Sequence, residues 1–173
     1  LSDFDISIVN SFLSPSITAI SLDKILMNSH LIMQHTISVQ RADALAEVVI
    51  DEALIEQAAL AALQHVGVSD MCELAVYVTT SDEIHELNRT YRHIDAPTDV
   101  LSFPVDGPEA LDWPDDGPPP ELGDILICPE AAEEPLTTLA VHGLLHLVGY
   151  DHEVDNGQML ALQDEIVDAA DAR

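Results

Sequence analysis

Residues 142–152 read HGLLHLVGYDH. The spacing of histidine and glycine in this stretch is the feature of the sequence that says most about the fold. Residues four apart lie on the same face of an α-helix, so His142 and His146 can present two imidazoles to one ion. Gly149 follows the second histidine by three residues, where glycine permits a left-handed turn that ends a helix. Such a turn would bring His152 back toward the other two. The stretch therefore predicts a helix that ends in a cluster of three imidazoles.

The chemistry of this cluster favours a metal ion. Three neutral imidazoles with an open fourth position suit a catalytic zinc ion, whereas a structural zinc is usually closed by four ligands, often thiolates. Two histidines four apart could equally be hydrogen-bonded core residues, and the third histidine is what favours metal binding. We expect His142, His146 and His152 to hold one zinc ion per chain, although three imidazoles also accept nickel or copper.

The two cysteines do not contribute a second kind of site. Cys72 and Cys128 lie far apart, each within an apolar run, and they form no CxxC pair. Neither a disulfide framework nor a cysteine-ligated metal site is indicated. The remaining histidines lack any ligand-like spacing and are expected to be surface or core residues.

The histidine spacing is that of zincin-type metallopeptidases, with one difference. Gly143 stands where those enzymes carry the glutamate that acts as general base. Peptide hydrolysis of the usual kind is therefore disfavoured. A zinc ion that lowers the pKa of a bound water to about 7 could still supply a nucleophile for another electrophile.

Strands and helices are expected to alternate around this stretch. Apolar and β-branched runs predict strands over 36–40, 72–80, 100–103 and 123–128, and helical spacing covers 51–65, 82–91, 135–148 and 159–170. The proline-rich residues 106–121 favour a surface loop. We expect an α+β fold in which a small mixed sheet is covered by helices, zincin-like with a three-histidine metal site.

The length of 173 residues fits a single domain, which we expect over residues 33–173. Residues 1–32 are an N-terminal extension of unclear status, rich in apolar residues but interrupted by Pro15, Asp23 and Lys24. They lack a basic n-region, and no stretch approaches the ~18 apolar residues of a membrane-spanning helix. We therefore expect neither a signal peptide nor a membrane anchor.

The charge of the chain is strongly acidic. Asp and Glu number 32 against five Lys and Arg, which gives a formal net charge of −27. Such a surface repels polyanions over roughly a Debye length, ~8 Å at physiological salt. Composition alone therefore argues against a generic nucleic-acid-binding protein and favours a solvated, solubilising surface.

Several motifs together resemble the YbeY family of bacterial endoribonucleases. The family signature is similar to residues 142–152. Further family motifs are similar, in the same order along the chain, to LNRTYR at 87–92, PTDVLSFP at 97–104, GDI at 123–125 and the helix at 159–166. The resemblance covers residues 37–170. It implies a zinc-dependent, single-strand-specific endoribonuclease of small-subunit ribosomal RNA maturation and ribosome quality control, located in the cytoplasm.

The same resemblance implies roles for single residues. His142, His146 and His152 correspond to zinc ligands, and Arg92 corresponds to a functionally important arginine beside the site. A guanidinium is always charged and pairs bidentately with phosphate, so Arg92 could stabilise the charge of a phosphodiester transition state. The implied partners are ribosomal RNA and the ribosome or its proteins.

Other interpretations stay open at this point. The chain could be a zinc hydrolase of a peptide or amide bond, or a ribosome-associated binding protein in which zinc is structural. Asp151 could orient an imidazole, move a proton or cap a turn. Thr98 and Asp99 are expected to fix the turn before the strand at 100–103.

Overall fold

The computed structural model describes residues 35–68, 71–112, 114 and 118–171. The expected N-terminal extension, residues 1–32, lies outside the described residues. The division of the chain into that extension and a domain over residues 33–173 therefore stays a prediction.

Four strands form one sheet in the order β1-β2-β4-β3. The strands are β1 Thr36–Arg41, β2 Glu73–Val78, β3 Val100–Pro104 and β4 Glu121–Ile127. β1 and β4 both pair parallel with β2, and β3 runs antiparallel to β4. The expected small mixed sheet is confirmed.

The proline-rich segment is more structured than the sequence predicted. A short 3-10 helix, Gly107–Asp112, lies inside the expected loop, and β4 begins at Glu121 rather than at Gly123. Glu121 pairs with Glu73 of β2, so the parallel ladder extends into the end of the segment. The run of prolines stops at residue 120, after which the backbone can again donate to a ladder.

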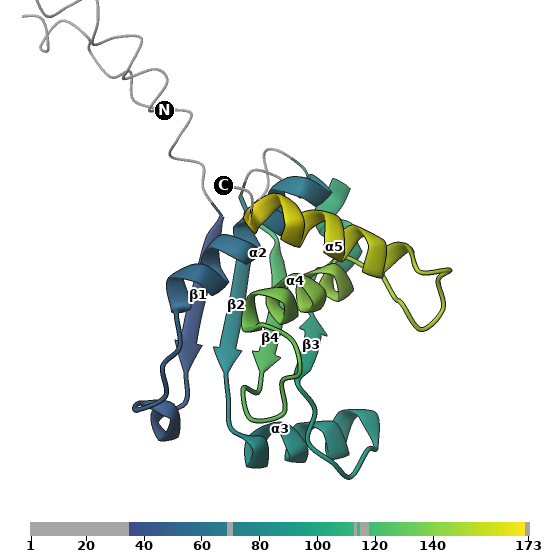
Figure 1. Ribbon diagram of the computed structural model, residues 1–173. Coiled ribbons are helices and arrows are strands. Elements are labelled where there is room, and N and C mark those ends of the chain that lie inside the picture. Colours follow the sequence, from purple (N-terminus) through teal and green to yellow (C-terminus); the bar gives the residue numbers. More distant parts are fainter. Residues whose placement is uncertain (1–34, 69–70, 113, 115–117, 172–173) are drawn as a thin grey trace, which may run out of the picture. The chain divides into compact units, whose positions relative to one another are not determined.

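Three helices cover one face of the sheet (Figure 1): α2 Glu52–Val66, α4 Leu136–Leu147 and α5 Gln158–Asp171. The short helix α3, Ser81–Leu87, follows β2 and lies at the carboxyl end of that strand. The fold is the expected α+β arrangement of a sheet under helices. Among the described residues, no helix has both the length and the apolar content needed to cross a membrane.

Helix α2 shows where the sequence pattern was ambiguous. Asp51 Oδ1 accepts a hydrogen bond from the Leu54 N–H at 3.1 Å as an N-cap, and Gly67 at φ +73° ends the helix. The helical spacing over 51–65 starts at Leu54 and so predicts that Leu54 lies on the buried face, which is wrong, because Leu54 is 50% exposed and Ile55 only 1%. Apolar residues occupy most positions of this helix, so their spacing alone does not define one stripe.

Helix α4 lies at the centre of the core. Nearly every position from Thr138 to Leu147 is buried, with His142 and His146 half-buried. One side of α4 packs against β3 and β4, and the other contacts α2 and α5. Met159 and Ile166 dock α5 on this layer and are 0% and 2% exposed. The core therefore holds in place the helix that carries the first two histidines.

Candidate metal centre

The structure brings the three histidines together. His142 and His146 lie one turn apart on α4, and His152 lies in the turn that follows. One ring nitrogen from each histidine lies within 4.8 Å of those from the other two. The ring centroid of His142 lies 4.8 Å from that of His146 and 5.0 Å from that of His152. A cluster with this geometry could hold a metal ion.

Hydrogen bonds fix which nitrogen of two histidines faces the cluster. His142 Nδ1 donates to Gln163 Oε1 on α5 at 2.8 Å, and His146 Nδ1 donates to the Tyr150 carbonyl at 3.0 Å. Both oxygens can only accept, so each Nδ1 carries the proton, and in the neutral form of the ring each Nε2 keeps a bare lone pair. The two Nε2 atoms lie 3.2 Å apart. Two lone pairs this close repel each other unless a cation or a proton lies between them.

A helix C-cap motif places both the Tyr150 carbonyl and His152. The Gly149 N–H bonds the His146 carbonyl at 3.0 Å, and the Tyr150 N–H bonds the Leu145 carbonyl at 2.9 Å. These two bonds form a Schellman motif, which needs a left-handed residue after the helix. Gly149 supplies it with φ +96°, as the sequence predicted. The chain therefore turns back on itself directly after the second histidine.

The environment of His146 favours the neutral form of its ring. The pKa of His146 lies below its usual 6.5, first because the ring is buried and then because His142 and His152 lie close to it. A neutral imidazole is the form that binds a metal ion. The lowered pKa of His146 therefore favours the form of this ring that can offer a lone pair to a metal ion.

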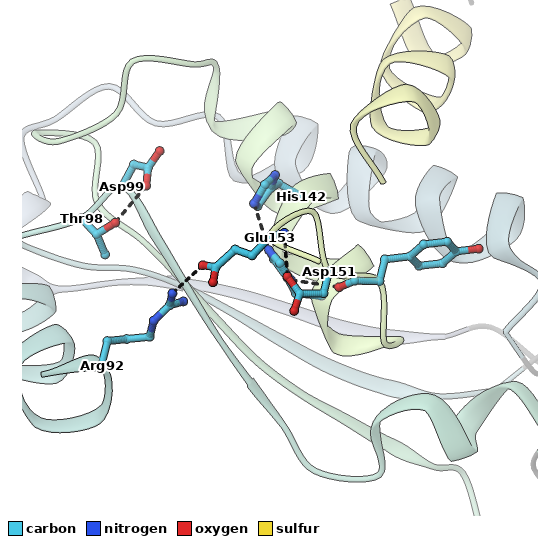
Figure 2. Close-up of polar contacts among 8 residues, drawn as sticks. Arg92, Thr98, Asp99, His142, Asp151 and Glu153 are labelled. Atoms are coloured by element: carbon cyan, nitrogen blue, oxygen red, sulfur yellow. Dashed lines mark hydrogen bonds and ion pairs between the residues drawn. The ribbon is translucent and has the colours of Figure 1, made fainter. Parts of the chain in front are cut away.

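The cluster forms one wall of a cavity of about 410 Å³. Its lining includes all three histidines together with Arg92, Asp99 and Glu153. Arg92 Nη2 donates to Glu153 Oε1 at 2.8 Å, and Figure 2 shows the two side chains pointing toward each other. The predicted arginine thus lies beside the histidines, and it is paired with a carboxylate.

A π-helical turn brings Arg92 to the cavity. The turn, Asn88–Arg92, continues from α3 and ends at His93 in the left-handed conformation at φ +60°. Asn88 is 4% exposed, and its side-chain amide donates to the Ala96 carbonyl at 2.8 Å. This bond ties the turn to the segment before β3 and so fixes the base of the Arg92 side chain.

The two aspartates near the site stabilise turns. Asp151 Oδ1 accepts the Glu153 N–H at 2.9 Å, which favours the turn-capping interpretation among the three left open. Asp99 Oδ1 accepts from the Val100 N–H at 2.9 Å and from Thr98 Oγ1 at 3.1 Å, as Figure 2 shows for Thr98. Thr98 and Asp99 therefore fix the turn before β3, as expected.

Gly143 has a steric role that accounts for the missing glutamate. A Cβ at this position would lie 2.6 Å from Ile125 Cγ2 and 3.0 Å from Ser102 Oγ. Ser102 Oγ also donates to the Gly143 carbonyl at 3.0 Å, so α4 lies directly on the sheet here. A glutamate at residue 143 would collide with the sheet, and the zincin base therefore has no room in this fold.

Two residues at the site escaped sequence reasoning. Gln163 lies within the helix predicted over 159–170, and the sequence pattern indicated no role for it, yet it fixes the His142 ring. A polar residue on the same face as Met159 and Ile166 is the signal that could have identified it. Glu153 carried no signal, because its partner Arg92 lies 61 positions away in the chain.

The remaining described histidines lie outside the cluster. His85 Nε2 lies 2.8 Å from Asp95 Oδ1, His65 lies 3.6 Å from Glu165, and His35 Nδ1 lies 3.1 Å from Cys72 Sγ. Both cysteines are buried and free.

Residues 36–171 match the family model described as Endoribonuclease YbeY. A relative of that description from Chloroflexus aurantiacus is 40% identical over 149 residues, which cover 78% of this chain and 95% of the relative. Another, from Bacillus subtilis, is 41% identical over 123 residues, which cover 62% of this chain and 78% of the relative.

A solution structure of the Thermotoga maritima protein TM1509 is 28% identical, with a TM-score of 0.47, and the match covers 78% of this chain and 89% of that one. The family match spans most of the described residues, and it includes the three clustered histidines and Arg92. The chain belongs to the YbeY family.

Proposed function

We propose that this protein is a zinc-dependent endoribonuclease that cleaves single-stranded RNA. The observation that carries the proposal is that three converging imidazoles and one arginine share a single cavity. Its relatives are described as endoribonucleases, which supports RNA as the substrate. The assignments of His142, His146 and His152 as metal ligands and of Arg92 as a catalytic residue belong to this proposal.

The donor set fits a zinc ion. Two Nε2 lone pairs face each other, and the third imidazole completes a three-histidine set with room for a further ligand from the cavity. One zinc per chain would match this set. A zinc ion held in this way supplies Lewis acidity and makes hydroxide available near neutral pH.

The residues of the chain would bind and orient the phosphodiester. Arg92 can form two parallel N–H···O bonds to phosphate oxygens and so neutralise charge that develops during cleavage. Gln163 and the Tyr150 carbonyl hold the rings of His142 and His146 in one orientation, so these imidazoles need not reorganise. The cavity of about 410 Å³ has room for a phosphate group beside Arg92, and the preference for single strands rests on the family resemblance.

We further propose a cellular role in small-subunit ribosomal RNA maturation and ribosome quality control, in the cytoplasm. This step rests on the family resemblance. Ribosomal RNA and the ribosome or its proteins would be the partners.

Elemental analysis combined with an RNA assay tests the proposal. We expect about one zinc per chain in the wild type, and cleavage of a single-stranded ribosomal RNA fragment. His146→Ala should lose both metal and cleavage, whereas the control His85→Ala, a histidine outside the cavity, should keep both. Bound zinc without RNA cleavage in the wild type would overturn the nuclease assignment, and absence of metal would overturn the site.

Two further measurements separate the alternatives. Casein hydrolysis by the same preparation would indicate a peptidase, which the contacts around Gly143 disfavour. Circular dichroism would show whether His142→Ala unfolds the domain. If it does, zinc is structural, and this result favours a ribosome-associated binding protein. A folded variant that no longer cleaves RNA supports a catalytic ion.

A further inference from the structure

We infer that Glu153 is a displaceable internal ligand of Arg92, which occupies the guanidinium that a substrate phosphate would take. Because phosphate and Glu153 compete for Arg92, Glu153 lowers the affinity of the cavity for an RNA strand. The inference rests on the proposed function, because it concerns the same site. It assigns to Glu153 a specificity role rather than a catalytic one.

Arg92 and Glu153 form an ion pair within the cavity that holds the histidines. Arg92 Nη2 lies 2.8 Å from Glu153 Oε1, and both residues line the same cavity as the histidines. They come from different elements, the π-helical turn after α3 and the turn after α4, and Figure 2 shows their side chains meeting. A carboxylate and a phosphate present the same kind of acceptor oxygens to a guanidinium.

The charged side chains that line the cavity leave few sites for a phosphate. Among the described residues, Arg92 is the cationic side chain of this cavity, and Asp99 and Glu153 contribute two carboxylates. The other arginines in the described part of the chain pair elsewhere, Arg41 with Glu52 and Arg89 with Glu86. A phosphate that takes the Nη2 donor of Arg92 must therefore displace Glu153, and one that uses another donor of this guanidinium meets the negative charge of Glu153 beside it.

The exposure of the pair makes displacement easy. The Arg92 and Glu153 side chains are 52% and 60% exposed. Ion pairs this exposed shift an equilibrium by no more than about fivefold. The Glu153 backbone is held by its N–H bond to Asp151 Oδ1 at 2.9 Å, so only the side chain has to rotate away.

A competing possibility makes the opposite prediction. Glu153 could instead hold Arg92 in the orientation that binds phosphate, in which case its removal would weaken RNA binding. An internal ligand of the kind inferred here would on removal tighten binding. The sign of the effect therefore decides between the two.

A double-mutant cycle tests the inference by fluorescence anisotropy. The probe is a fluorescein-labelled single-stranded 2′-O-methyl RNA of twelve nucleotides, with its integrity checked on a gel and the zinc content of each variant measured. Glu153→Gln should tighten binding about two- to fivefold. In the Arg92→Gln background the same substitution should change binding by less than about twofold, because the pair is already broken.

The control removes the same charge at another ion pair. Glu52→Gln frees Arg41, whose pair with Glu52 is 3.0 Å long and lies outside the cavity, and it should leave probe binding unchanged. A gain of binding in Glu52→Gln as large as in Glu153→Gln, or one that persists without Arg92, would show general charge repulsion and overturn the inference. Weaker binding in Glu153→Gln, or no binding by any variant, would overturn it too.

Cleavage kinetics separate this inference from the proposed function. If the protein cleaves RNA, Glu153→Gln should lower KM by the same factor and leave kcat nearly unchanged. If no variant cleaves RNA but the Arg92-dependent gain in binding is observed, the inference holds and the nuclease proposal fails. A lower kcat with unchanged KM would instead give Glu153 a role in the chemical step and overturn the inference.

Discussion

Gln163 determines how His142 presents its lone pair. Its Oε1 accepts the Nδ1 proton at 2.8 Å, so Nε2 faces the cluster. We expect Gln163→Leu to lower zinc affinity by roughly 10- to 100-fold, the usual effect of losing the partner of a ligating imidazole. Competition with a chromogenic chelator measures this affinity.

The matched variant for this prediction is Gln163→Glu. A carboxylate also accepts the Nδ1 proton, so zinc affinity should stay at or above the wild-type value. Wild-type affinity in Gln163→Leu would show that the ring is held by packing alone, and would contradict the role assigned to this hydrogen bond.

Cys72 couples stability to alkaline pH. Burial raises the pKa of its thiol from 9.0 to about 12, and the residue is 1% exposed. The unfolded chain releases the proton near pH 9 while the folded chain retains it. This contribution to stability is therefore complete below pH 9 and is lost as the pH rises toward 12. At pH 10.5 we expect a loss of about 2 kcal/mol relative to pH 8 from this group.

Urea unfolding of wild type and Cys72→Ala at pH 8 and pH 10.5 isolates the thiol. The variant should be less stable at pH 8, because a buried atom is removed, but it should lose less stability between the two pH values. Other groups that ionise in this range contribute to both proteins and cancel in the comparison. An equal alkaline loss in the two proteins would show that the thiol ionises freely in the folded state.

At the level of elements, the C-cap of α4 contributes to the stability of the fold and also positions residues of the metal site. Gly149 has φ +96°, and a Cβ there would lie 2.8 Å from Pro108 Cγ. Gly157 has φ +84° with nothing within 4 Å of such a Cβ. We expect Gly157→Ala to cost roughly 1–2 kcal/mol from backbone strain alone, and Gly149→Ala to cost ~1–3 kcal/mol more from overpacking.

The two glycine variants should also differ in zinc affinity. Gly149→Ala should weaken binding, because the cap positions the Tyr150 carbonyl under His146, while Gly157→Ala should bind as the wild type does. Thermal unfolding and chelator competition on both variants check this. Equal destabilisation of the two would mean that Pro108 moves aside at no cost.

The elements of this fold were largely predictable because local patterns determine them. Buried residues alternate along β2, and a glycine ends α4. Each of these signals depends only on residues a few positions apart in the sequence. The histidine cluster was predictable for the same reason, since helical spacing and one left-handed turn bring the three rings together. These features need no knowledge of the rest of the chain.

The parts that were not predictable depend on contacts between distant residues. The buried face of α2 is chosen by the sheet and α4, because Leu54 and Ile55 are equally apolar. The position of Arg92 depends on a π-helical turn tied by Asn88 to Ala96, and its pairing with Glu153 joins two separate turns. No local periodicity encodes such contacts.

At the scale of the whole molecule, the net charge of −27 changes how RNA must bind. Proteins that neutralise six to ten phosphates lose affinity by about 10³- to 10⁵-fold between 50 and 200 mM salt. Here Arg92 is the cationic side chain that the described residues place in the cavity. One phosphate contact on a single strand corresponds to a slope of only about −0.7, or roughly a threefold loss over this range.

Salt also screens the repulsion between the acidic protein and RNA, which favours binding as the salt concentration rises. The Debye length falls with rising salt and is about 10 Å at 0.1 M, so long-range repulsion between the acidic surface and RNA weakens as salt increases. We therefore expect the association rate of a single-stranded RNA to rise between 20 and 200 mM salt, and the affinity to change by less than about fivefold. Stopped-flow fluorescence gives the rate and anisotropy gives the affinity.

An oligonucleotide with neutral methylphosphonate linkages provides the control, because its association rate should not depend on salt. If the affinity for ordinary RNA instead fell by orders of magnitude, several phosphates would be neutralised at once. Cationic groups beyond Arg92 would then have to face the strand, and Lys24 and Arg173, which lie outside the described residues, would be the first to substitute. A weak salt dependence would place recognition in the cavity itself, where Arg92 and the proposed zinc ion counter the acidic surface over a short range.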